Sequence, residues 1–120
     1  DVASWTVSES QILCQKAQEL GVDIIDVSSG GLVPAPIVTG PGYQVGFAQA
    51  IKNSVTIPVI AVGQLGDPLL AQATLDDDAA DAVDIGRAAL VDAAWPLHAA
   101  EKLGIPKGFW PIPPSYRRGF

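Results

Sequence analysis

Apolar and polar positions along the chain follow two periods in turn, and these periods predict alternating helices and strands. Thr6 and Glu9 have the spacing of a capping box, and Gly21 follows a stretch whose apolar positions repeat every three or four residues. The pattern predicts a first helix between Thr6 and Gly21. The apolar residues that share one face of this helix are Ile12, Leu13, Ala17 and Leu20.

Three apolar stretches are typical of strands that are covered on both faces in a parallel sheet. They lie at residues 22–28, 57–63 and 81–85. Helical patterns separate and follow them at residues 43–54, at 68–75, from 87 onward, and at 97–103. Asp67 and Pro68 are suited to the N-cap and first position of the helix at 68–75, and Gly104 closes the last helix.

Helix and strand that alternate three times predict parallel pairing through right-handed crossovers, which is α/β architecture. Three parallel strands alone leave two open edges and an uncovered apolar face. We therefore expect either that another chain supplies further strands or that these strands belong to a closed barrel. The chain contains no methionine, and we expect it to be a piece of a longer protein.

Each predicted strand ends in residues suited to binding an anion. The first ends in residues 28–31 (SSGG), the second in Gly63 and Gln64, and the third in Gly86 and Arg87. Carboxyl ends of parallel strands lie at one rim, where glycine exposes backbone N–H groups and arginine adds a charged fork. In (β/α)8 barrels the loops after the last two strands commonly hold a phosphate. The sequence therefore predicts a phosphate site at this rim.

A long loop lies near the predicted rim site, and the rim also has an interpretation without a ligand. The loop at residues 29–43 holds four glycines and three prolines, and loops of this length in a compact domain usually carry function. An alternative interpretation of the rim needs no ligand: glycines turn the chain, and Arg87 pairs with a surface acid such as Asp92.

Charge and composition exclude several classes of partner. Seven Lys/Arg against thirteen Asp/Glu give a net charge of −6, which leaves no electrostatic basis for binding nucleic acid. No apolar run reaches the roughly 18 residues of a membrane span, so we expect no membrane partner and a soluble, cytoplasmic protein. The single Cys14 cannot form an internal disulfide.

Three reactive side chains have structural explanations. His98 has no Ser, Cys or carboxylate placed in the sequence to form a triad or metal site, so we expect a structural or surface role. Asp26 and Asp84 alternate to positions that could point into a barrel, where we expect them to form hydrogen bonds rather than to catalyse.

Four motifs occur in a characteristic order and spacing: IDVSSGG at 25–31, PGYQV at 41–45, PVIAVG at 58–63 and IGRA at 85–88. A fifth, YRRGF at 116–120, ends the chain. Together they resemble the C-terminal part of the Old Yellow Enzyme family of FMN-dependent ene-reductases, and in particular the branch with an arginine finger in its tail. The resemblance covers nearly the whole chain.

The resemblance implies a fold and a cofactor. Residues 1–104 would be strands six to eight, with their helices, of a (β/α)8 TIM barrel that binds FMN and is completed by another chain or fragment. The residues implied around the FMN phosphate are Ser28, Gly63, Gly86 and Arg87, with Ser29, Gly30 and Gln64 adjoining through their backbone. Residues 105–120 would be a tail at a subunit interface of a homo-oligomer. There, Arg118 would reach a neighbour's active site, with Tyr116 stabilising the tail.

The resemblance also implies an activity: reduction of activated C=C bonds in small enones with NAD(P)H. The family's catalytic residues belong to earlier strands, so none lies in this chain, and we expect it to be inactive without an N-terminal barrel fragment, present as a separate chain. One rival interpretation is another phosphate-binding barrel, such as a different FMN oxidoreductase or an aldolase-like enzyme. Another is a non-catalytic half-barrel that acts as an assembly module.

Overall fold

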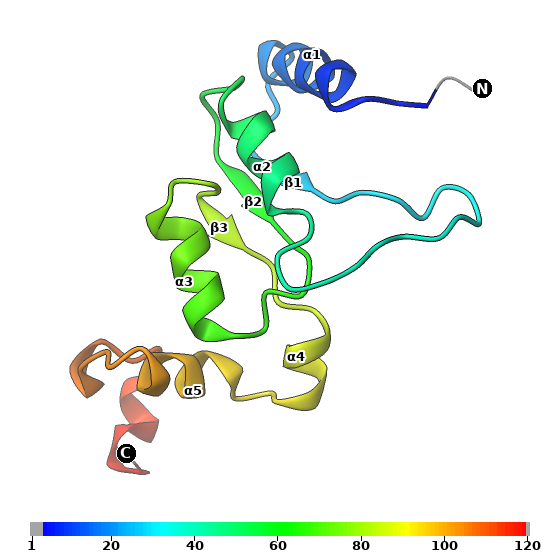
Figure 1. Cartoon of the computed structure of the whole chain (residues 1–120). Helices are drawn as coiled ribbons and strands as arrows, with labels where there is room; N and C mark the ends of the chain where they lie inside the picture. Colours follow the sequence, from blue (N-terminus) through cyan, green and yellow to red (C-terminus); the bar gives the residue numbers. More distant parts are fainter. Residues whose placement is uncertain (1–3, 120) are drawn as a thin grey trace.

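The computed structural model describes residues 4–119 and has α/β architecture with a small parallel sheet (Figure 1). Strands β1 (Ile25–Val27), β2 (Val59–Ala61) and β3 (Ala82–Val83) lie side by side in chain order. In the parallel register, Ile25 pairs with Val59 and Ala61 with Val83. Residues 1–3 of the predicted barrel part and Phe120 of the tail motif lie outside the described residues.

Helices alternate with the strands as the sequence predicts. Their bounds are α1 (Val7–Glu19), α2 (Val45–Lys52), α3 (Pro68–Asp76), α4 (Arg87–Val91) and α5 (Trp95–Lys102), followed by the 3₁₀ helices η1 (Lys107–Phe109) and η2 (Pro114–Gly119). The predicted caps are confirmed: the Thr6 hydroxyl accepts from the backbone N–H of Glu9, and the Asp67 carboxylate accepts from that of Leu69. Within residues 4–119, no helix is long and apolar enough to cross a bilayer.

The strands are shorter than the apolar stretches that predict them. Residues 22–28 yield a strand of three residues, and residues 81–85 a strand of two. A strand exists only where a neighbour pairs with it, and β3 has β2 as its one neighbour in the described sheet. The outer ends of the apolar stretches therefore remain extended chain without a ladder.

One face of the sheet carries the hydrophobic core. Its alternate residues pack against α2 and α3 in a single cluster, centred on Ala48, Ile51, Val59, Ala61 and Leu65. The inward-facing strand residues of that cluster are Ile25, Val27, Val59, Ala61 and Val83. Strands that follow one another in chain order by right-handed crossovers place all their helices on the same side, so this face is filled.

The other face of the sheet is open. It carries Asp26, Ile60, Ala82 and Asp84, and the two aspartates are exposed. Neither carboxylate makes a hydrogen bond to a described residue, so the expected bonding of these two side chains is not observed within residues 4–119. Partial burial and the nearby charge of Asp84 raise the pKa of Asp26 above its ordinary value.

α1 lies beyond α2 and is attached to it by three glutamines at helical spacing (Figure 1). Gln11 and Gln15 donate to the backbone carbonyls of Ala50 and Ser54, at 2.8 and 3.2 Å. Gln18 accepts from the backbone N–H of Thr56, at 2.7 Å. The edge of α1 that meets the segment of α2 is therefore largely polar, with Cys14 packed against the core beside it.

The large apolar side chains at the outer side of α1 face solvent. Ile12 and Leu13 are exposed, and Leu20 is 87% exposed. Exposed apolar residues that share one helical face require cover from elsewhere.

The amino ends of the strands are joined by an ionic cluster on the side opposite the predicted phosphate site. Lys52, at the end of α2, donates to Asp78 at 2.6 Å and to Asp81 at 2.9 Å. The second carboxylate oxygen of Asp81 accepts from the backbone N–H of Val59, at 2.9 Å. These hydrogen bonds, first from Lys52 and then from Val59, hold the pKa of Asp81 below its ordinary value.

The lowered pKa of Asp81 predicts an acid-sensitive contribution to stability. The charged carboxylate stabilises the fold above its unfolded-state pKa of about 4, and this contribution is lost as the pH falls through the lower folded-state pKa. Asp81→Asn keeps an acceptor for Val59 but removes the charge. We expect the variant to have a lower urea midpoint than the parent at pH 7, and the difference to vanish under strongly acidic conditions. A difference independent of pH would contradict this account.

Candidate functional site

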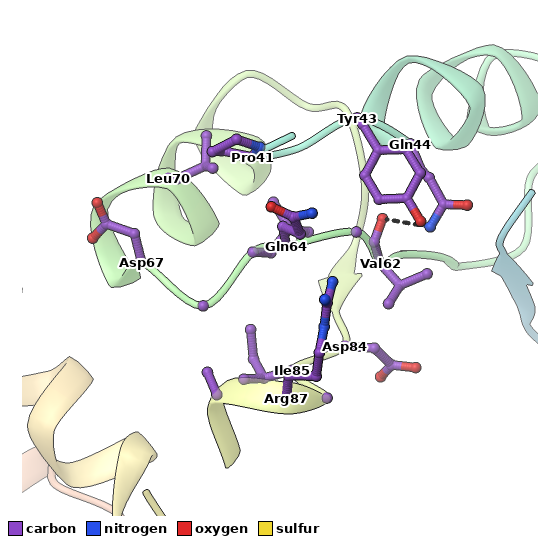
Figure 2. A pocket seen from close by; sticks show the side chains of 15 residues that line it. Pro41, Tyr43, Gln44, Val62, Gln64, Asp67, Leu70, Asp84, Ile85 and Arg87 are labelled. Atoms are coloured by element: carbon purple, nitrogen blue, oxygen red, sulfur yellow. Dashed lines mark hydrogen bonds between the residues drawn. The ribbon is translucent and has the colours of Figure 1, made fainter. Parts of the chain in front are cut away.

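A cavity of about 710 Å³ opens at the carboxyl ends of β2 and β3 (Figure 2). We call it the rim cavity. Four of the seven residues that the sequence analysis names around the phosphate line it: Gly63, Gln64, Gly86 and Arg87. The structure therefore brings together the ends of the second and third strands, as expected for parallel neighbours.

Ser28 lies elsewhere. It lines an adjacent cavity of about 470 Å³ between the start of α1, the end of β1 and α2. Trp5 and Phe47 line the same cavity, which gives it a more apolar wall. The end of β1 thus lines this second cavity and not the rim cavity.

Arg87 is the first residue of α4 and follows the end of β3 by four residues. Figure 2 shows its side chain reaching upward between Gln64 and Val62. Its guanidinium forms no ion pair or hydrogen bond with a described residue. The alternative pairing with Asp92 is not observed, because Asp92 contacts His98 instead. The one arginine at this rim therefore presents an unpaired cation to the cavity.

The turn after β2 depends on glycine. Gly63 is buried and has φ +125°, and Gln64 follows with φ +55°. A Cβ on Gly63 would lie 3.1 Å from Tyr43 and 3.2 Å from Gln44. The Gly63 carbonyl accepts from the N–H of Gly42, at 2.9 Å, which joins this turn to the long loop before α2.

Gln44 is a buried residue that the sequence analysis did not single out. Its side chain is only 3% exposed and joins two rim segments. Its amide oxygen accepts from the backbone N–H and from the hydroxyl of Ser29, and its amide nitrogen donates to the carbonyl of Val62. The Ser29 N–H is therefore engaged by Gln44 and is not directed to the rim cavity. A glutamine next to the helix start carries no sequence signal for this role.

Two carboxylates stand at the border of the rim cavity, and neither is directed at Arg87. Asp84 points away from the guanidinium in Figure 2. Asp67 is held by Lys102, at 2.8 Å, and by the N–H of Leu69, which keep its pKa below the ordinary value. The charge available to an incoming anion is that of Arg87.

The predicted interface residues lie far from this cavity. Tyr116 and Arg118 belong to η2, in the tail beside α5 at the end of the molecule opposite α1 (Figure 1). Both are exposed, and Tyr116 is 68% exposed. The tail is anchored further back, where the Trp110 indole donates to the Ile105 carbonyl at 2.7 Å and Ile112 is buried. Tyr116 and Arg118 are thus presented outward.

Comparison with known proteins gives consistent matches. An NADPH dehydrogenase of Geobacillus thermodenitrificans is 40% identical over 115 residues, which is 96% of this chain and 33% of that protein. Those of Bacillus subtilis and Bacillus pumilus are 41% and 48% identical over 103 and 86 residues, which cover 86% and 72% of this chain and 30% and 25% of theirs. This chain is homologous to the C-terminal part of Old Yellow Enzyme family proteins.

The homology is partial in length. The chain spans about a third of the curated NADPH dehydrogenases that it matches. No protein-family model matches it. Within residues 4–119, no group of three or more His, Cys, Asp or Glu side chains could hold a metal ion.

His98 has a carboxylate partner that the sequence analysis did not foresee. Its Nδ1 lies 2.6 Å from Asp92, six residues earlier and across the junction of α4 and α5. The spacing matches neither i,i+3 nor i,i+4 on one helix, so helical periodicity could not reveal the pair. The hydrogen bond with Asp92 raises the pKa of His98 and lowers that of Asp92.

The glycine turn at the rim predicts a contrast between two substitutions. Gly63→Ala adds a Cβ at positive φ against Tyr43 and Gln44, and we expect it to lower the free energy of unfolding by about 1–3 kcal/mol. Gly46→Ala lies in α2 with open space around the added Cβ, and should stabilise by about 0.5–1 kcal/mol. Urea unfolding of both variants measures the contrast. Equal effects would mean that the turn has no special conformation.

Proposed function

We propose that this chain is the phosphate-binding C-terminal part of an FMN-dependent ene-reductase that reduces activated C=C bonds of small enones with NADPH. Its homology to NADPH dehydrogenases supports the oxidoreductase class. The observation that carries the proposal is the unpaired guanidinium of Arg87 in the rim cavity, at the ends of two adjacent parallel strands.

A (β/α)8 barrel is the architecture that accounts for the incomplete sheet. Strands in chain order with helices on one face form the wall of such a barrel, and the open face would be its interior. The open edges of β1 and β3 would pair with strands of the missing part. Its relatives are about three times as long, which leaves room for five further strands and their helices.

The rim residues are suited to the phosphate of FMN. Arg87 supplies the charged fork, and the missing side chains of Gly63 and Gly86 allow an oxygen to approach the backbone. Gln64 lines the same cavity, whereas Ser28 would have to join from the adjacent one when the missing part is present. A cavity with one unpaired cation and no carboxylate directed at it fits an anionic group.

FMN, when bound, supplies the hydride transfer between NADPH and the alkene. This chain's own residues bind the cofactor's phosphate and fix its position, and they supply no proton donor or substrate carbonyl ligand. Those groups belong to the N-terminal part, which we propose is a separate chain. The 120 residues alone should therefore show no turnover.

A chimera tests the assignment of Arg87. The C-terminal third of the Bacillus subtilis relative is replaced by this chain, and FMN affinity is measured by flavin fluorescence. Arg87→Ala should weaken FMN binding by about 1.5–3 kcal/mol, or roughly tenfold to a hundredfold, because a charged hydrogen bond to phosphate is lost.

The matched control for this substitution is Lys16→Ala, which removes a cation from the outer surface of α1 and should leave FMN affinity unchanged. Equal affinities of the Arg87→Ala and parent chimeras would exclude Arg87 as a phosphate ligand. A chimera that folds but holds no flavin would reject the cofactor assignment itself.

The tail gives a separate prediction. We propose that Arg118 enters the active site of a neighbouring subunit and that Tyr116 stabilises the tail. In the oligomeric chimera, Arg118→Ala should raise the KM for an enone several-fold with little change in FMN affinity, because the residue would contact substrate and not phosphate. Arg117→Ala, its exposed neighbour in η2, is the control. Identical kinetics of the two variants would remove Arg118 from the site.

A further inference from the structure

Asp92 joins the end of α4 to the start of α5 through four hydrogen bonds. Its backbone N–H donates to Ala88 at 2.9 Å, and its carbonyl accepts from Trp95 at 3.1 Å. One carboxylate oxygen accepts from the N–H of Ala94 at 3.0 Å, and the other lies 2.6 Å from Nδ1 of His98. Both main chain and side chain of this residue are therefore used at a single junction.

α4 has little else to fix its place. It has five residues, none of them buried, and Val91 is 90% exposed. It comes close to the loop before α3 at Ala88, because a Cβ on Gly66 would lie 2.7 Å from the Cβ of Ala88. The helix that carries Arg87 thus depends on its two ends: the chain leaving β3, and the Asp92 junction.

α5, in contrast, is fastened to the segment that forms the wall of the rim cavity. The Trp95 indole donates to the carbonyl of Gly66 at 2.8 Å, and Lys102 pairs with Asp67 at 2.8 Å. Gly66 and Asp67 both line the rim cavity. The hydrogen bond that Asp92 accepts from His98 of α5 therefore links the position of α4 to the cavity wall.

We propose that Asp92 and His98 are positioning residues, which hold α4 so that Arg87 faces the anion in the rim cavity, and that protonation of His98 strengthens this hold. The inference rests on the proposed function only in taking that anion to be a phosphate.

The direction of the pH effect follows from the groups around His98. Asp92 faces it from the junction, and Glu101 lies one turn further along α5. Lys107 of η1 lines, together with His98, a third cavity of about 470 Å³ that is distinct from the one beside Ser28. Asp92 and, to a smaller extent, Glu101 raise the pKa of His98. The ion pair is therefore complete below the raised pKa and is lost as the pH rises through it.

Nuclear magnetic resonance of the 120-residue chain gives a test that needs no ligand. The amide shifts of Gly86, Arg87 and Ala88 should titrate with the same apparent pKa as the His98 ring, and His98→Gln should abolish that titration. Amide shifts at Arg87 that ignore the His98 titration would overturn the proposal. Lys16→Gln is the control, because this exposed cation lies on α1.

Anion affinity gives the second test, with inorganic phosphate on the chain and FMN on the chimera as probes. At pH 6 the parent should bind each probe about threefold to tenfold more tightly than His98→Gln or Asp92→Asn. The ratio of parent to variant affinity should fall toward one as the pH rises through the His98 pKa. Because parent and variant are compared at the same pH, the ratio removes the effect of the phosphate's own ionisation on affinity.

The outcomes separate this inference from the proposed function. Binding of FMN with the same pH profile in the parent and His98→Gln would overturn the positioning role and leave the phosphate site intact. Failure of both probes to bind the parent at any pH would reject the phosphate site, while the amide titration still decides whether His98 acts on Arg87. A drop in urea midpoint without any change at Arg87 would assign the pair to stability alone, against the proposal.

Discussion

The arrangement of the whole chain depends on one constraint: three parallel strands in chain order place their helices on a single face of the sheet. That face is filled by α2 and α3, and the core is complete there. The opposite face carries two exposed aspartates, and both sheet edges lack a neighbour within the described residues. Ile12, Leu13 and Leu20 add an exposed apolar side at α1. The described residues therefore form a sheet with one filled face and one open face.

The amino and carboxyl ends of the strands differ in the charged groups that they carry. At the amino ends of the strands, Lys52 and Asp81 neutralise one another and satisfy the Val59 backbone. At the carboxyl ends, Arg87 has no described partner, and glycines replace side chains that would fill the space. Stabilising pairs at one end and an uncompensated cation at the other are what parallel α/β architecture generally shows, with binding at the carboxyl ends. Gln44 stabilises the rim by hydrogen bonds to Ser29 and Val62, and it does not bind Arg87.

Much of this could be predicted from sequence, for identifiable reasons. Local signals such as the Thr6 cap and the Asp67 cap depend only on short-range sterics and hydrogen bonds, and the structure confirms both caps. The same short-range sterics explain the glycine after each strand. Gly63, Gln64, Gly86 and Arg87 converge because parallel topology requires it. The separate placement of Ser28, the bracing by Gln44 and the pairing of His98 with Asp92 depend on loop paths and on contacts across a helix junction. Periodicity carries no information on these. The same holds for the exposure of Ile12 and Leu13, because periodicity does not show that the glutamines of α1 make its contacts.

The attachment of α1 has a consequence for how freely this region can vary. Gln11 and Gln15 donate to main-chain carbonyls, and Gln18 accepts from main-chain N–H groups. None of these contacts requires a particular side chain at the positions that are bound, and none carries a net charge. Side-chain substitutions at Ala50 or Ile57 would therefore leave these hydrogen bonds in place. Changes in ionic strength would also have little effect on them, because no charged group takes part. The contacts of these glutamines therefore bind α1 to main-chain groups, and residues on its outer face can change without altering those contacts.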